Sequence, residues 1–276
     1  MKDINIREIK KLAWDSLCDN LEQPVLISSM MILICLTVFL VGELLLTALR
    51  FYFPEPFTSS EITNIYTVIR IVISFAVIAP YVSGAIFWYA LKYRSGSCPV
   101  KCALCCYRFS KRFVKAIWVN LMAALPAAVL SVAYAAVLVL IYTLCSSLAG
   151  SDGFTGTAIL LGAAAAILTC AFIYLFIWIT LRFSMSNIIF ALDPDTSPYE
   201  ILRMSAFFMS GKKWSLVRLS FSFMPWLPLT LLGFPALLIL PYIFMSMTVY
   251  FDSIITEITG GSSIERFKER VAKHER

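Results

Sequence analysis

The stretch that decides the fold is residues 158–181, which read AILLGAAAAILTCAFIYLFIWITL. These 24 residues carry no acidic or basic side chain. A helix of about 20 such residues crosses the roughly 30 Å hydrocarbon core of a bilayer. A helix that is apolar on every side needs lipid or a very large protein core around it. The stretch therefore predicts a transmembrane helix.

Further stretches of similar character predict an all-α, polytopic integral membrane bundle of six transmembrane helices. Hydrophobic residues make up 60% of the sequence and charged residues 14%, against about 45–50% and about 25% in soluble domains. Such a chain is too apolar for a water-soluble domain. The spans are expected at about 25–48, 66–91, 116–144, 158–181, 214–232 and 235–255, within a membrane domain of residues 24–256.

Both ends of the chain are predicted to lie outside the spans. In residues 1–23, the apolar side chains of Ile9, Ala13 and Leu17 recur every fourth position between charged residues. This spacing indicates an amphipathic helix, and we expect that helix to lie at the membrane interface. Residues 257–276 form a charged tail, which we expect in the cytoplasm.

The distribution of lysine and arginine predicts the orientation, because basic residues are retained on the cytoplasmic side of a membrane. Basic residues occur in residues 1–23, in 92–115, in 182–213 and in the tail, whereas the three intervening connections hold only Arg50. Since basic segments alternate with bare ones, both termini are expected inside the cell.

Several short motifs resemble one known family. They are Ile6-x-x-Ile9-Lys10-x-x-Ala13, Pro80-x-x-x-Gly84, Ser205-x-x-x-Met209-x-Gly211-Lys212, Leu219-Ser220-Phe221-x-Phe223-x-x-Trp226 and Pro241-Tyr242. In these motifs the chain resembles the bacterial membrane proteins called domain of unknown function 975, which are distantly like the membrane domain of some glycerophosphodiester phosphodiesterases. The resemblance implies a helical fold in the inner (plasma) membrane of a bacterial cell. It implies no established activity.

Residues for common catalytic chemistry are scarce. The single histidine, His274, falls in the charged tail, which argues against histidine-based acid–base chemistry and most zinc enzymes. Cys98, Cys102, Cys105 and Cys106 stand in a basic loop at a spacing that metal sites also use. Reduced thiols without a metal are the favoured interpretation. We therefore expect no enzyme activity, no cofactor and no nucleic-acid partner.

Two charged residues fall inside predicted spans, where charge is costly. Glu43 lies in the outer part of the first span and Arg70 in the outer part of the second. Antiparallel neighbours would bring both side chains to a similar depth. The favoured interpretation is a structural ion pair in the membrane. A coupling-ion site, or separate contacts of each side chain with the outer surface, are the alternatives.

Polar residues gather toward the cytoplasmic ends of the predicted spans. Two interpretations stay open: a ligand groove that opens to the cytoplasmic leaflet, or hydrogen bonds between helices. Arg182 or Arg218 is expected to pair with Asp252, and Pro225 and Pro228 predict a broken helix. The groove residues are Asn120, Arg182, Ser184, Asn187, Ser220, Ser222, Ser246 and Asp252.

The sequence leaves the biochemical function open between classes. The leading hypothesis is a non-enzymatic protein that binds a lipid-like or peptide ligand, or a partner protein, at the cytoplasmic leaflet, in an accessory role in transport or envelope maintenance. The alternative is a small secondary transporter that uses an inner polar cavity and the broken helix. Membrane lipids are the expected partners, with another membrane protein or a second copy of the chain as further candidates.

Overall fold

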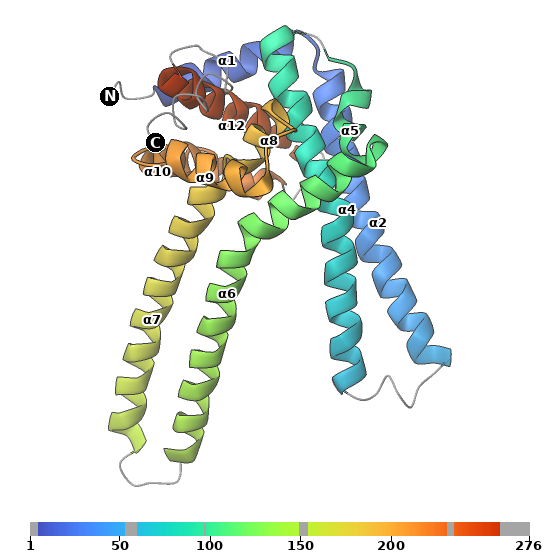
Figure 1. Ribbon diagram of the computed structural model, residues 1–276. Coiled ribbons are helices and arrows are strands. Elements are labelled where there is room, and N and C mark those ends of the chain that lie inside the picture. The colour runs from blue at the N-terminus through green and yellow to red at the C-terminus, as the bar shows by residue number, and fades with distance from the viewer. Residues whose placement is uncertain (1–4, 53–59, 97, 149–153, 231–234, 260–276) are drawn as a thin grey trace.

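The computed structural model describes residues 5–52, 60–96, 98–148, 154–230 and 235–259, and within these ranges the chain is helical and contains no strand. Its four longest helices form two antiparallel hairpins, which spread apart from a shared end (Figure 1). We call these hairpins the arms. The first arm is α2 (Glu22–Tyr52) with α4 (Ser60–Ser95), and the second is α6 (Ser110–Leu148) with α7 (Phe154–Phe183).

The remaining helices pack together at the shared end and form a part that we call the head (Figure 1). The ends of α4 and α6 nearest the head extend into it, and the fully buried side chains of α4 begin at Ala79. The head elements are α1 (Ile6–Cys18), η1 (Val100–Leu104), α5 (Cys105–Arg108), α8 (Ser186–Leu192), α9 (Pro198–Phe208), α10 (Lys213–Phe221), η2 (Met224–Trp226), α11 (Leu227–Thr230) and α12 (Ala236–Thr259).

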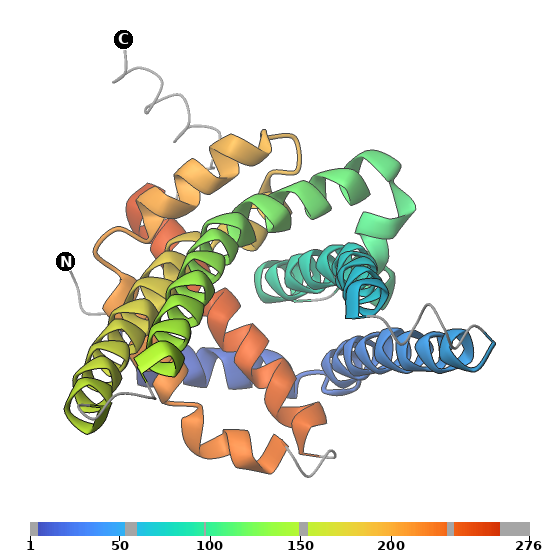
Figure 2. The ribbon, with the colours of Figure 1, turned by 90° about the horizontal axis from the view of Figure 1, so that it is seen from below.

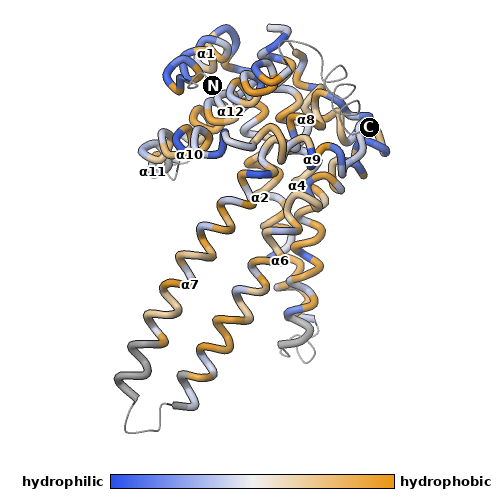
Figure 3. The backbone as a smooth tube through the Cα atoms, turned by 60° about the vertical axis from the view of Figure 1, so that its left-hand side comes forward, coloured by the Kyte–Doolittle hydropathy of each residue, from blue (hydrophilic) through white to orange (hydrophobic). Residues whose placement is uncertain are grey.

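Outside the head, the arms consist largely of hydrophobic residues, as the colouring in Figure 3 shows. Leu44, Val132 and Ile167 are each at least 70% exposed. Such a surface is unfavourable in water and favourable in lipid. Among the described residues, five helices are long and apolar enough to cross a membrane: Glu22–Leu49, Asn64–Ser95, Ser110–Leu144, Leu161–Leu192 and Ala236–Thr259. The chain therefore has the character of an integral membrane protein.

The predicted span 214–232 is not one helix. Helix α10 ends at Phe221, and the short turns η2 and α11 follow it. Pro225 and Pro228 fall in this interruption, and neither has a backbone N–H for a helical hydrogen bond. The prediction of a broken helix is confirmed, and whether the broken segment makes a sixth crossing stays a prediction.

Helix α12 lies across the head rather than alongside the arms (Figures 1 and 2). Met245, Val249 and Tyr250 are at most 1% exposed and belong to the hydrophobic core of the head. Trp88 of α4 and Ile189 of α8 are fully buried in the same core. The apolar composition of α12 is thus largely used for packing against protein.

The amphipathic helix α1 packs against α12 in the head. Ile9, Ala13 and Leu17, the apolar stripe found in the sequence, are 4%, 0% and 1% exposed. The side chain of Lys10 adds a contact with the end of α10, since its Nζ donates a hydrogen bond to the carbonyl of Ser222, 3.1 Å away. The stripe expected to face lipid is therefore covered by protein.

Candidate functional site

A cavity of about 270 Å³ lies in the head between α4, α7, α8, α10 and α12. Ligand pockets usually measure about 300–1,000 Å³, so this cavity suits a narrow group such as part of a hydrocarbon chain. Its walls hold no charged side chain, and three hydroxyl groups are their polar elements. The lining residues are Ile86, Leu181, Ser184, Ile188, Leu216, Ser220, Phe244, Met247, Thr248 and Phe251.

Helical spacing explains why these side chains meet. The lining residues of α12 share one face of that helix. Met247, Thr248 and Phe251 lie three, four and seven positions after Phe244. The Thr248 hydroxyl donates to the carbonyl of Phe244 at 2.8 Å. The hydroxyl of Ser184 donates to the carbonyl of Leu181 at 2.9 Å. Both hydroxyls are therefore satisfied by their own segments and do not demand a polar ligand.

Two cations lie beside this cavity at the ends of α7 and α10. The Nζ of Lys213 is 3.4 Å from the ring centre of Trp178, and the Cζ of Arg182 is 5.8 Å from the same centre. Burial lowers the pKa of Lys213, and the positive charge of Arg182 lowers it further. Arg182 directly follows the lining residue Leu181, and Lys213 lies three positions before the lining residue Leu216, so both cations belong to segments that form the cavity wall.

The structure divides the predicted groove into separate places. Ser184 and Ser220 line the cavity, and Arg182 lies next to it. Asn120 and Asn187 form a different cluster with Ser83, where α4, α6 and α8 meet. Asn120 Nδ2 donates to Ser83 Oγ at 2.9 Å, Ser83 Oγ donates to Asn187 Oδ1 at 2.8 Å, and Asn187 Nδ2 donates to Asn120 Oδ1 at 3.0 Å. This closed ring of hydrogen bonds joins three helices and matches the helix-to-helix interpretation.

Asp252 does not pair with Arg182 or Arg218, so that prediction is wrong. Its carboxylate accepts two hydrogen bonds from Arg94, at 2.9 Å from Nε and 2.6 Å from Nη2. Asp252 of α12 thus contacts the C-terminal end of α4, where Arg94 lies. The pair joins these two helices and leaves Arg182 free of this carboxylate.

Ser222 and Ser246 do not line the cavity either. The Ser222 hydroxyl donates to the carbonyl of Leu219 at 2.5 Å. The hydroxyl of Ser246 is buried and has no hydrogen-bond partner within the described part of the chain. Ser246 lies two positions from both Phe244 and Thr248, and a step of two along a helix turns by roughly 200°. Its side chain therefore lies on the face of α12 opposite the cavity.

Glu43 and Arg70 meet in the first arm. Arg70 Nη1 donates a hydrogen bond to Glu43 Oε1, and the guanidinium carbon of Arg70 lies 5.2 Å from the ring centre of Phe39. Both charged side chains belong to the first arm, and neither lines the cavity. The two side chains therefore form an ion pair within the arm, and its role as a structural pair stays a prediction.

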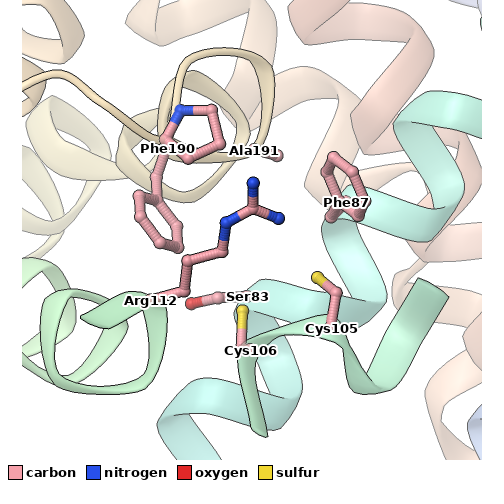
Figure 4. Close-up of a pocket in the computed structure, with 8 residues that line it drawn as sticks. Ser83, Phe87, Cys105, Cys106, Arg112, Phe190 and Ala191 are labelled. Atoms are coloured by element: carbon pink, nitrogen blue, oxygen red, sulfur yellow. The ribbon is translucent and has the colours of Figure 1, made fainter. Parts of the chain in front are cut away.

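A second, much smaller cavity borders the cysteine loop, and Figure 4 shows the guanidinium of Arg112 extending past the thiols of Cys105 and Cys106. Its volume of about 10 Å³ leaves room for a single water molecule at most. The thiol hydrogen bond from Cys106 lowers the pKa of Cys105 to about 7, helped by the positive charge of Arg112. Burial raises the pKa of Cys98 to about 12.

The cysteine loop is the place where the sequence offered a candidate metal site. Within the described residues, no three side chains among histidine, cysteine, aspartate and glutamate lie close enough together to hold a metal ion. A thiolate zinc site needs four convergent ligands.

Lys213, Trp178 and Thr248 are among the site residues that sequence reasoning missed. Lys213 was one basic residue of a connection, and nothing in the order of residues places it over Trp178 on another helix. Thr248 lies in a stretch of α12 where Ser246, Asp252 and Ser253 are also polar, so composition alone did not distinguish it.

The arms and the packed head define a helical integral membrane protein with an apolar cavity at the junction between them. A comparison with known families matches residues 1–257 to the family described as "Protein of unknown function (DUF975)". The chain belongs to this family, as its motifs predict. No curated protein and no solved structure matches the chain.

Proposed function

We propose that the protein binds the hydrocarbon chain of a lipid-like molecule in the head cavity, as a non-enzymatic accessory protein of the membrane. The observation that carries this proposal is the cavity of about 270 Å³, whose walls are apolar except for three hydroxyl groups. A hydrocarbon chain gains free energy on leaving water for such walls. It demands no hydrogen bond in return.

The position of the cavity supports entry of the ligand from the membrane. Residues 158–181 of α7 correspond to about 36 Å of helix, somewhat more than the roughly 30 Å hydrocarbon core. The core boundary then falls near Trp178 and Arg182, and tryptophan and arginine are typical of that boundary. Leu181 lines the cavity. The cavity is therefore within reach of the leaflet that the head adjoins.

The head is assigned to the cytoplasm of a bacterial cell, at the inner membrane. Residues 92–115 and 182–213 carry most of the basic side chains between the arms' helices, and both segments belong to the head end of the molecule. Basic connections are retained in the cytoplasm. The ligand would then come from the cytoplasmic leaflet.

A lipid fits the cavity better than a peptide does. A peptide brings backbone N–H and C=O groups, and burying each without a partner costs about 1–3 kcal/mol. The hydroxyls of Ser184 and Thr248 already bond to carbonyls of their own segments. The cavity thus offers a peptide little compensation.

Filling the cavity tests the proposal. Ser220 lines the cavity and is exposed. The Ser220→Phe variant should therefore fill part of the cavity without disturbing the buried hydrophobic core. We expect detergent-purified S220F to retain at least about tenfold less co-purified lipid than the unchanged protein in native mass spectrometry, a loss of about 1.4 kcal/mol in binding.

The matched control is Ser146→Phe, the same change at an exposed position near the far end of α6. It should leave lipid retention unchanged. Equal retention in both variants would refute binding in the cavity. If a peptide instead of a lipid co-purifies with the unchanged protein and is absent from S220F, the ligand class is a peptide and the lipid proposal is refuted.

A further inference from the structure

We infer that Lys213 and Arg182 bind the phosphate group of the lipid whose chain enters the head cavity. The inference rests on the proposed function for the lipid as occupant. The contacts of the two cations supply its independent evidence.

The cations come from two different helices and converge on one indole. Lys213 belongs to α10 and lies with its Nζ 3.4 Å from the ring centre of Trp178 in α7. Arg182, also in α7, lies 5.8 Å from that centre. Each contact is a favourable cation–π interaction. Holding both cations over the same ring also brings two like charges close together, which is unfavourable.

No carboxylate offsets this repulsion within the ranges that the structure describes. Three other cations of the molecule do have a carboxylate partner. Arg94 pairs with Asp252, Arg70 with Glu43, and Lys212, the immediate neighbour of Lys213, with Glu257 at 2.8 Å. Lys213 and Arg182 form no ion pair in the same ranges. Burial and the charge of Arg182 both lower the pKa of Lys213, and a bound anion would oppose this shift.

One molecule can reach the cations and the cavity at once. Lys213, Leu216 and Ser220 are spaced by three and seven positions, so they share one face of α10. Leu216 and Ser220 line the cavity. Lys213 precedes Leu216 by three positions, a rise of about 5 Å along α10, and Arg182 directly follows the lining residue Leu181 in α7. A phosphate beside Trp178 would therefore leave an attached chain next to the opening.

The chemistry of the pair favours phosphate. A guanidinium presents parallel N–H groups that match two phosphate oxygens, and an ammonium adds a compact charge. Trp178 lies where the indole ring of an interfacial anchor is expected. The phosphate of a membrane lipid occupies this same level, whereas free phosphate would have to come from the cytosol.

The test uses the full-length protein in detergent, titrated with phosphatidylglycerol and with diacylglycerol of the same chains, and read by native mass spectrometry. We expect the double variant R182Q/K213Q to bind phosphatidylglycerol at least about tenfold more weakly, because each hydrogen bond to a charged group contributes about tenfold or more. Its affinity for diacylglycerol should not change. The Lys111→Gln variant, which removes an exposed charge elsewhere in the head, should alter neither.

The outcomes separate this inference from the proposed function. Unchanged phosphatidylglycerol binding by R182Q/K213Q would overturn the phosphate site, even where S220F still abolishes binding of both lipids. Loss of both lipids by R182Q/K213Q, with helix content unchanged by circular dichroism, would also overturn it, since diacylglycerol has no phosphate. Binding of inorganic phosphate alone that competes with phosphatidylglycerol and is lost in the double variant would overturn the lipid as its source. Retained binding by R182K and K213R would support a charge-dependent site.

Discussion

At the residue scale, Cys105 differs from Cys98 and Cys106 of the same loop in the acidity of its thiol. Its pKa is lowered from 9.0 to about 7 by the hydrogen bond from Cys106 and by the charge of Arg112, against the opposing effect of burial. A pKa of about 7 leaves about half of the thiol ionised at pH 7, against about one part in a hundred at a pKa of 9. Because the thiolate is the nucleophile, Cys105 should react first.

We expect maleimide labelling of Cys105 to rise with pH through a midpoint near 7, as followed by peptide mapping. The Arg112→Gln variant removes a charge that favours the thiolate, so its midpoint should move to higher pH and its labelling at pH 7 should slow. Cys98, whose pKa is about 12, should stay unlabelled over the same range. A Cys105 midpoint near 9 would contradict the contacts described for Arg112.

The ring of Ser83, Asn120 and Asn187 leads to a prediction about stability. Replacing Asn120 with alanine leaves Ser83 and Asn187 each without one partner inside the head. Unsatisfied buried groups cost about 1–3 kcal/mol, so we expect a loss of that size in the free energy of unfolding, measured in detergent. Thr143→Ala is the control on the same helix: its exposed hydroxyl bonds only to Leu140, and its effect should stay within about 0.5 kcal/mol. Similar effects of both changes would argue against the ring as a structural contact.

These residues also show what could be predicted one position at a time. Asn120 and Asn187 could be selected because amides are rare in apolar helices. Ser83 could not, since serine often bonds to its own helix. Arg94 was not predicted as the partner of Asp252, because their contact depends on the direction in which α12 crosses the head. The local sequence around Asp252 contains no signal for that direction.

At the scale of elements, the close approach of α4 and η1 depends on Gly84. A Cβ built at this position lies 2.0 Å from the carbonyl oxygen of Ala103, far closer than two such atoms can stand. We expect Gly84→Ala to displace η1 and to destabilise the head by about 1–3 kcal/mol, as overpacking does. Gly162→Ala in α7 meets no atom within 4 Å and should be neutral or slightly stabilising, because alanine favours helix. Thermal unfolding of both variants in detergent tests the contrast, and equal stability would show that η1 can move freely.

The contact between α2 and α4 depends on the pair of Glu43 and Arg70. Removing one partner leaves an uncompensated charge in an apolar arm, which costs about 3–5 kcal/mol in buried pairs; both side chains are partly exposed here, at 44% and 29%, so we expect less. E43L or R70L alone should therefore lower the yield and thermal stability of folded protein, whereas E43L together with R70L should recover most of the loss. A double variant as unstable as the two single changes combined would mean that the charges act separately.

Hydropathy and proline placement were sufficient to predict the arms and the break after α10. Hydropathy was not sufficient to orient α12, because a helix buried in a protein core and a helix buried in lipid have the same composition. The stripe of α1 was ambiguous for the same reason. An apolar stripe such as Ile9, Ala13 and Leu17 can pack against either lipid or protein. In the structure the stripe is buried and α1 packs against α12.

At the scale of the whole molecule, the lengths of the arms and the place of α12 together suggest fewer crossings than the six expected. Outside the head, α4 runs from Ser60 to Ala79, and 20 residues of helix correspond to about 30 Å, the thickness of the hydrocarbon core. The arms alone are therefore long enough to cross the bilayer. Helices α10, α11 and α12 lie at the level of the head (Figures 1 and 3), so the head need not enter the membrane. We propose four crossings, with the connection between α10 and α12 on the side of the basic segments.

Labelling of single cysteines in intact cells decides between four and six crossings. Each variant carries one cysteine in a background whose native cysteines are replaced, at the exposed positions Lys111, Ser146 and Leu229. A membrane-impermeant maleimide should label Ser146→Cys near the tip of the second arm, because that tip faces outward in either arrangement. With four crossings, Leu229→Cys in α11 behaves like Lys111→Cys and is labelled only after the cells are opened. With six crossings, residue 229 approaches the outer surface, so labelling of Leu229→Cys in intact cells together with Ser146→Cys would place α12 in the membrane. The cavity walls that α12 supplies would then face a different environment, and the assignment of the ligand to the cytoplasmic leaflet would lose its basis.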